Sequence, residues 1–181
     1  MKKISAALFL ALSLAAASAP AFAHKAHAHG AAKLNVVVDG DDVTIALETP
    51  LINLISFERA PRNDKEREEA KSMAAVLQNA EALFLFPQDA QCRLKSVQLE
   101  ASAIAAELGA AAAKKPRAAK DDHNDLDAEF SFTCQNSAAL NQIEVRLFQP
   151  FPQMKRLDAS LVTPKRQKAT RLAPRNNRLS W

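Results

Sequence analysis

The sequence is poor in the residue types and motifs that build many catalytic sites. It has only three glycines, no tyrosine and one tryptophan among 181 residues. It contains no glycine-rich phosphate loop and no Gly-x-Ser-x-Gly nucleophile motif. Aromatic residues are too few to form an obvious platform for a substrate. Composition and motifs therefore give no support to a nucleotide-binding protein or to a serine hydrolase.

Long apolar runs are missing from the chain except at its start. Met1-Lys2-Lys3 is a short basic segment, residues 4–17 are apolar, and Ala21-Phe22-Ala23 has the small-x-small form of a cleavage site. The apolar run is shorter than the roughly 20 residues that a transmembrane helix needs. We therefore predict a secretory signal peptide at residues 1–23, an exported chain that begins at His24, and no stable membrane insertion. No cysteine follows the cleavage site, which argues against a lipid anchor.

Only two cysteines, Cys92 and Cys134, are present, and both lie in the exported part. In an oxidising compartment, an isolated pair is typical of a disulfide bond. Such a bond closes a loop of about 40 residues and should stabilise the fold by about 4 kcal/mol. The alternative is a thiolate metal site or a catalytic thiol, and either would need reduced sulfur atoms.

The net charge is small. The formal value is +4, and loss of Lys2 and Lys3 with the signal peptide lowers it by two. An exported chain does not meet nucleic acid, so we interpret the basic residues near the C-terminus as solvated strand faces.

Alternating apolar and polar residues predict a largely β-sheet protein. Two such runs flank Asp39-Gly40 and indicate a hairpin over residues 34–47. Further strands are predicted at residues 92–101, 128–134, 143–147, 157–161, 167–172 and 178–181. Leu94 is out of phase with Val97, which suggests a bulge or a change of face. Short alternating strands favour antiparallel sheets with one wet face.

One long amphipathic helix interrupts this β pattern. Asn63 or Asp64 can cap its start, with Glu66 as a capping-box partner, and it should end near residues 79–82. The helix presents a narrow apolar stripe formed by Ala70, Met73, Ala74 and Leu77. Residues 101–113 are rich in alanine and are a second helix candidate. The predicted class is therefore α+β, a mainly antiparallel, sandwich-like sheet structure with one long helix.

Residues 24–181 are predicted to form a single domain. Residues 24–33 would be a flexible, histidine-bearing N-terminus, and residues 114–126 an exposed charged loop. If the strands that carry Cys92 and Cys134 pair antiparallel, the two cysteines lie opposite each other. The charged loop would then form the free tip of a long hairpin.

Three of the four histidines, His24, His27 and His29, lie within seven residues. In an extended chain His27 and His29 point the same way, and their alanine neighbours leave room for a metal ion. Neutral imidazole is the commonest nitrogen ligand of zinc in proteins. The alternative is a disordered tail that binds nothing.

Cleavage after Ala23 would also place an α-amine beside the imidazole of His24. Copper favours such nitrogen sets, so a copper-binding oxidative enzyme with an N-terminal histidine brace is a further hypothesis. The fourth histidine, His123, has acidic neighbours that include Asp121, Asp122 and Asp125. With Asp127, these four acids around one imidazole could hold a cation weakly, or they could be a solvated acidic loop. Glu58 is a further candidate carboxylate ligand.

A series of short motifs follows in order along nearly the whole exported chain. These are His29-Gly30-Ala31-x-x-Leu34-x-Val36, Leu47-Glu48-Thr49-Pro50, Phe57-Glu58-Arg59-Ala60-Pro61-Arg62, Leu83-Phe84, Cys92-Arg93-Leu94, Phe130-x-Phe132-x-Cys134, Leu147-Phe148-x-x-Phe151-Pro152, Thr163-Pro164-x-x-Gln167 and Leu179-Ser180-Trp181. Together they resemble the ZrgA-like family of periplasmic zinc-uptake accessory proteins. The resemblance implies a zinc-binding protein of the Gram-negative periplasm that works beside an ABC-type importer or its binding protein.

The chain differs from that family pattern in two places. Family members usually carry a long tract rich in His, Asp and Glu between the two cysteines, and here that tract holds only His123 among lysines and acids. The Glu-His pair of the family is Glu58-Arg59 here. The resemblance therefore carries over Glu58 alone.

The sequence thus predicts a non-catalytic periplasmic protein that binds Zn²⁺, with Cu²⁺ as a possible metal. The predicted ligands are His24, His27, His29, Glu58 and His123. Zinc would be held by neutral imidazoles and passed on by ligand exchange, so binding should weaken below a pH of about 6.5. The alternative is a metal-independent envelope module that docks to a transporter component through its sheet.

Overall fold

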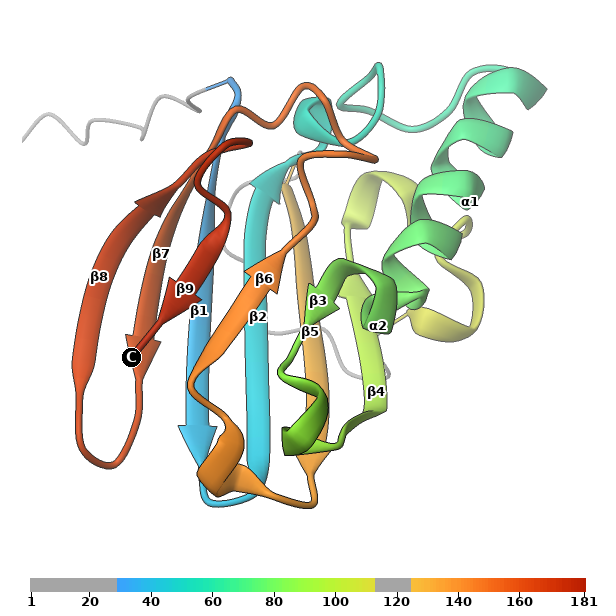
Figure 1. Ribbon diagram of the computed structural model, residues 1–181. Coiled ribbons are helices and arrows are strands. Elements are labelled where there is room, and N and C mark those ends of the chain that lie inside the picture. The colour runs from blue at the N-terminus through green and yellow to red at the C-terminus, as the bar shows by residue number, and fades with distance from the viewer. Residues whose placement is uncertain (1–28, 113–124) are drawn as a thin grey trace, which may run out of the picture.

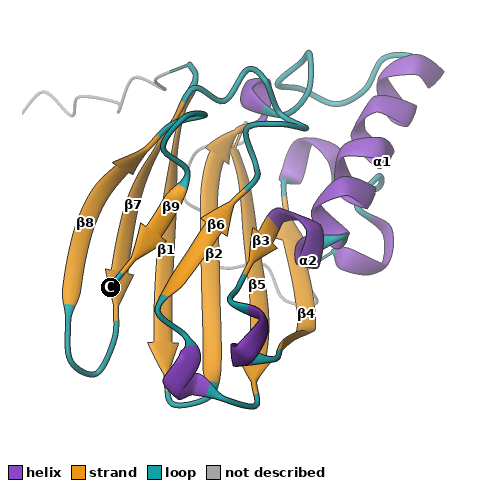
Figure 2. Cartoon of the chain, in the orientation of Figure 1, coloured by secondary structure: helices purple, strands orange, loops and turns teal. Residues whose placement is uncertain are grey.

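The computed structural model describes residues 29–112 and 125–181 as two β-sheets with helices at one side (Figures 1 and 2). The strands are β1 Ala31–Asp39, β2 Asp42–Pro50, β3 Phe84–Leu85, β4 Cys92–Glu100, β5 Asp125–Cys134, β6 Gln142–Val145, β7 Arg156–Val162, β8 Gln167–Leu172 and β9 Arg178–Ser180. The helices are α1 Asp64–Gln78 and α2 Ala80–Leu83. Short 3₁₀ turns are η1 Leu51–Asn53, η2 Gln88–Ala90, η3 Ser102–Ile104, η4 Gly109–Ala111 and η5 Ser137–Ala139.

The larger sheet has six strands in the order β4-β5-β2-β1-β7-β8. The predicted hairpin is confirmed as β1 and β2, and the pair Asp39 and Asp42 closes it. Gly40 in the turn has φ +58°, a conformation that costs glycine least. All pairs in this sheet are antiparallel except β1 with β7, which run parallel. Parallel pairing of two strands so far apart in sequence leaves no signal in alternation patterns.

The smaller sheet, β3-β6-β9, covers one face of the larger sheet. Between the sheets lies an apolar core in which Phe84 packs on Phe130, with ring centroids 4.9 Å apart. Phe86 packs on Phe132 at the same separation. Along β1, β2 and β5, every second residue is buried in this core. The predicted sandwich-like α+β fold is confirmed.

Strand β4 forms one edge of the six-stranded sheet and pairs with β5. Cys92 lies directly opposite Cys134, and the predicted disulfide joins them with an S–S distance of 2.07 Å. The pairing shifts between Leu94 and Ser96, so Lys95 is an extra residue in a β-bulge. The bulge explains why Leu94 is out of phase with the apolar residues that follow it.

Helix α1 begins as predicted. The side chain of Asn63 caps the helix by accepting a hydrogen bond from the Glu66 N–H at 2.9 Å. The carboxylate of Glu66 accepts the N–H of Arg62 at 2.7 Å, one residue earlier than in a standard capping box. The apolar stripe of the helix is buried. Ser56 donates to Glu69 through both its N–H and its hydroxyl, which fixes the preceding loop against the helix.

The predicted boundaries were wrong in three places. The alanine-rich segment after β4 forms η3 and η4 and no α-helix. Strand β1 begins at Ala31, so the end of the predicted flexible N-terminus belongs to the sheet. Strand β5 begins at Asp125, three residues before its predicted start, and Leu126, predicted as loop, is fully buried. In both strands the apolar alternation continues to the observed start, through Ala32 in β1 and Leu126 in β5, so the predicted boundaries stopped short of the pattern.

Within the described residues, none of the helices is long and apolar enough to cross a membrane.

Candidate functional site

The described chain begins at an anchored turn. The N–H of Gly30 donates to Oδ1 of Asn53 at 2.7 Å, and Nδ2 of Asn53 donates to the Ala31 carbonyl at 2.9 Å and to Oγ1 of Thr49 at 3.1 Å. Asn53 and Thr49 are each 1% exposed. The carbonyl of Gly30 also accepts the N–H of Lys155 at 2.8 Å. A buried polar network therefore fixes the backbone next to His29, whose side chain is exposed.

Glu58 lies half-buried in the loop between η1 and α1. Its neighbour Arg59 stands where the family resemblance implies a histidine. Arg59 makes a bidentate ion pair with Glu66, at 2.7 and 2.9 Å, and its Cζ lies 5.5 Å from the ring centroid of Phe57. Arg59 therefore stabilises the start of α1, and its protonated guanidinium offers no lone pair to a metal ion.

The Arg59 pair also changes the acidity of its partner. The hydrogen bond from Arg59, with help from the Arg62 N–H, lowers the pKa of Glu66 from 4.5 to about 2. The groups that lower this pKa, Arg59 and the Arg62 N–H, are structural partners at the start of α1. The perturbed pKa therefore marks a helix start and does not mark a metal site.

Both histidine-bearing segments join the described chain at one end of the six-stranded sheet, which we call the junction end. It is formed by Gly30, the last residues of β2, Asn53, and the first residue of β5, Asp125, which pairs with Pro50. Figure 1 shows β1 starting and β2 ending at this upper end of the sheet. The chain leaves the described part at Ala112, which bridges Leu99 of β4, and returns at Asp125. His29 and the segment that contains His123 therefore meet the sheet two strands apart.

Carboxylates gather on the polar face of the sheet at the junction end. Glu48 is paired in register with Asp127, and Asp127 with Glu100, so three acidic residues lie side by side on neighbouring strands. Directly opposite side chains have Cβ atoms about 5 Å apart. Lys33 at the β1 end of this row pairs with Glu48 at 3.1 Å. Asp125 and Glu129 flank the row on β5.

Sequence reasoning named Asp125 and Asp127 but missed Glu48, Glu100 and Glu129. Strand alternation places Glu48 and Glu129 on the polar faces of their strands, which is a usable signal. The order of the strands decides that they become neighbours, and alternation does not contain that order. All five carboxylates take part in polar interactions.

The predicted ligands fall mostly outside the described residues. His24, His27 and His123, with Asp121 and Asp122, lie there, whereas His29 and Glu58 are described. Within residues 29–112 and 125–181, no three His, Cys, Asp or Glu side chains converge so as to hold a metal ion. The disulfide occupies both thiols, which leaves imidazole and carboxylate as the available ligands.

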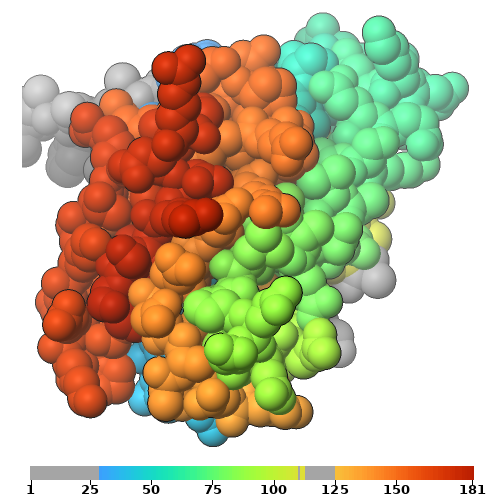
Figure 3. Space-filling model, viewed as in Figure 1, coloured from blue at the N-terminus to red at the C-terminus, as the bar shows by residue number. Residues whose placement is uncertain are grey.

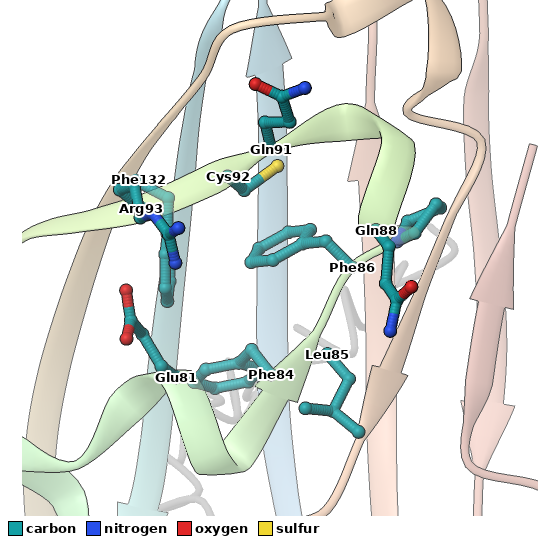
Figure 4. Close-up of a pocket in the computed structure, with 10 residues that line it drawn as sticks. Glu81, Phe84, Leu85, Phe86, Gln88, Gln91, Cys92, Arg93 and Phe132 are labelled. Atoms are coloured by element: carbon teal, nitrogen blue, oxygen red, sulfur yellow. The ribbon is translucent and has the colours of Figure 1, made fainter.

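A separate pocket of about 360 Å³ opens between β3 and β4, away from the junction end (Figure 4). Phe84, Phe86 and Phe132 line it with the Cys92 end of the disulfide, and Glu81 and Arg93 stand at one side. Glu81 also accepts the Leu94 N–H at 3.1 Å. The pocket has one described carboxylate and no histidine, so it offers no zinc-binding set.

The comparison with protein families agrees with the motifs along the chain. A family model described as "ZrgA family zinc uptake protein" matches residues 26–181, almost the whole of the predicted exported chain. Among curated protein sequences, none matches this chain. The family's description names an uptake role and no catalytic activity, and the disulfide fits an oxidising compartment outside the cytoplasm. The chain therefore belongs to the ZrgA family of zinc uptake proteins.

Proposed function

We propose that the protein is a non-catalytic, zinc-binding accessory of zinc import in the periplasm. Its ligands would be His24, His27, His29 and His123, with Glu58 as a carboxylate partner. Zinc is the cargo, and an ABC-type importer or its binding protein would receive it. Family membership supports the zinc role.

The junction end is the observation that supports the choice of the histidines as ligands. His29 directly precedes the anchored Gly30, and His123 lies two residues before Asp125. Two residues of extended chain span at most about 7 Å. Strands β1 and β5 are separated only by β2, a distance of about 10 Å at usual strand spacing. Both histidine-bearing segments can therefore reach the same few ångströms of space above the sheet.

Carboxylates at the junction end would favour a cation there. Glu48, Asp127 and Glu100 lie in one row on β2, β5 and β4, near the points where the two segments join the described chain. A cluster of negative charge raises the local concentration of Zn²⁺ and favours its capture by neutral imidazole. Thus the histidines would supply the zinc–nitrogen bonds, while the carboxylate row would supply long-range attraction.

The first test is calorimetric titration of Zn²⁺ into protein that begins at His24. Replacing His24, His27 and His29 together with alanine should weaken binding at least about tenfold, because each lost ligand removes favourable coordination energy. Glu58→Gln should weaken it less, with Glu81→Gln, a carboxylate distant from the junction end, as the matched control. Absence of binding at micromolar Zn²⁺ would refute the proposal.

Asn53→Ala tests whether the anchored turn positions the site. It removes the acceptor of the Gly30 N–H and the donor to the Ala31 carbonyl. We expect weaker zinc binding together with a loss of about 1–3 kcal/mol in unfolding free energy. Unchanged zinc affinity in a destabilised variant would show that the turn does not contribute to binding.

The remaining alternatives are separated by two further experiments. Growth under zinc limitation that is fully rescued by a variant lacking all four histidines would favour the metal-independent module. A copper brace requires the free α-amine of His24, so one extra N-terminal residue should abolish tight Cu²⁺ binding if that hypothesis holds.

A further inference from the structure

Strand β8 forms the other edge of the six-stranded sheet. Within the described part of the chain, no strand pairs with its outer side. Its pairing with β7 runs from Leu157–Leu172 to Val162–Gln167 without a register shift. Residues 167–172 contain no proline. The edge is therefore regular, and bulges and prolines are the common devices that block the addition of another strand.

The turn between β7 and β8 determines which backbone groups face outward. The N–H of Thr163 donates to the Arg166 carbonyl at 2.8 Å, so these two residues are a hydrogen-bonded pair. In an antiparallel ladder, hydrogen-bonded and non-hydrogen-bonded pairs alternate. Gln167, Ala169 and Arg171 therefore direct their N–H and C=O groups away from β7. These three alternate residues present enough free N–H and C=O groups to pair with a short added strand.

The C-terminal segment that contains this edge is rich in basic residues, of which Arg178 is paired with Glu144 of β6 at 3.4 Å. Residues 155–181 contain a single acidic side chain, Asp158, and the following eight basic residues: Lys155, Arg156, Lys165, Arg166, Lys168, Arg171, Arg175 and Arg178. Asp158 is already paired with Arg156 and Arg171, each at 3.3 Å. Lys165 and Arg166, in the turn before β8, are both exposed. Figure 3 shows that the C-terminal strands, in red, occupy this margin of the surface.

Charge decides which partner fits the edge. A second copy would bring like charges together across an antiparallel β8–β8 pair, which is unfavourable. A lipid surface matches the charge, but headgroups do not match a row of regularly spaced N–H and C=O groups. An extended acidic segment satisfies both features at once, because its backbone completes the ladder and its carboxylates meet the basic side chains.

We propose that β8 is a docking edge for an extended, acidic segment of another protein, which adds to the sheet as a seventh strand. Backbone hydrogen bonds from Gln167, Ala169 and Arg171 hold the added strand. Lys165 and Arg166 select acidic side chains and accelerate the encounter. This interaction involves neither zinc nor the histidines, so it stands or falls separately from the proposed zinc binding.

The test uses a synthetic octapeptide of alternating Val and Glu, with Val–Lys and Val–Gln peptides for comparison. We expect the Val–Glu peptide to bind best, to lose affinity as salt is added, and to slow amide hydrogen exchange at Gln167, Ala169 and Arg171. Ala169→Pro removes one outward N–H and leaves the bonds to β7 intact. It should reduce affinity roughly tenfold through the lost bond and the blocked approach.

A second variant tests the charge requirement without touching the strand. Lys165→Glu with Arg166→Glu should weaken the Val–Glu peptide and strengthen the Val–Lys peptide. Lys65→Glu with Lys71→Glu on α1 makes the same change in net charge and should alter neither. Absence of binding, or equal binding of the acidic and basic peptides, would overturn the proposal. Tight binding to anionic phospholipid vesicles that Ala169→Pro leaves unchanged would instead identify a lipid-binding surface and also overturn it.

Discussion

The two edges of the six-stranded sheet are built in opposite ways. Strand β4 begins at the disulfide-bonded Cys92, carries a bulge at Lys95, and lies beside α1 and the bridge from Ala112. Strand β8 has no bulge, no disulfide and no covering helix among the described residues. One edge is closed by covalent and steric devices, whereas the other is protected only by positive charge. Charge prevents self-pairing but still permits pairing with an acidic partner.

The two proposed binding sites lie at different places on the six-stranded sheet. The junction end lies at the ends of the central strands β1, β2 and β5, where both histidine-bearing segments enter the described chain. The β8 edge lies at the side of the same sheet. A partner could therefore bind along β8 without covering the junction end. Such an arrangement would hold an acceptor protein close to the zinc ligands while leaving them accessible.

Removal of the disulfide should have the largest effect on stability, and it should open the closed edge at β4. We expect Cys92→Ala with Cys134→Ala to lower the unfolding free energy by about 4 kcal/mol, because the cross-link restricts the unfolded chain. Urea denaturation measures the loss, and hydrogen exchange should show β4 and β5 opening before β7 and β8. Reduced wild-type protein is the control and should behave alike. A loss below about 1 kcal/mol would contradict the entropic argument.

Truncation of Leu172 tests how the β8 edge is held without a cross-link. Leu172 is the one fully buried side chain of β8 and pairs with Leu157. Leu172→Ala should cost about 2–5 kcal/mol through lost burial and the cavity left behind. Gln167→Ala in the same strand should change stability by less than about 0.5 kcal/mol. Equal effects of the two substitutions would mean that β8 is not anchored by its apolar contact.

Loss of the helix cap should have a smaller effect, confined to the β4 side. Asn63→Ala removes the acceptor for the Glu66 N–H, and we expect a cost of about 1 kcal/mol. Asn79, at the other end of α1, makes no side-chain cap to the following helix, so Asn79→Ala is the matched control. Thermal or chemical unfolding measures both. Faster hydrogen exchange in β8 of the Asn63 variant would show coupling that the structure does not suggest.

The smallest expected effect is a pH dependence at the start of α1. The pKa of Glu66 is about 2 in the folded protein, below its usual value of 4.5, because Arg59 and the Arg62 N–H stabilise the carboxylate. Its contribution to stability is therefore complete above pH 4.5 and is lost as the pH falls toward 2. Glu66→Gln should flatten this part of the stability profile measured by denaturation at several pH values. An unchanged profile would show that the ion pair contributes nothing in solution.

Much of the fold could be predicted because its signals are local. The Asp39-Gly40 turn, the Asn63 cap and the alternation along the strands each arise within a few residues. The disulfide was predictable because two cysteines allow only one intramolecular pairing. The alanine-rich segment after β4 was not predictable in the same way, since its helix propensity yielded to packing against β4 and α1.

For the candidate site too, some residues could be predicted from the sequence and others only from the tertiary structure. The histidine cluster, His123, Glu58 and the family itself are read from the residues, because ligand chemistry and motif order need no geometry. The tertiary structure alone brings Glu48 and Glu100 beside Asp127, and assigns Arg59 to a salt bridge. It also makes β8 an edge and β5 an interior strand. The physical reason is that strand order and register are set by long-range packing, whereas alternation records only which face of a strand is buried.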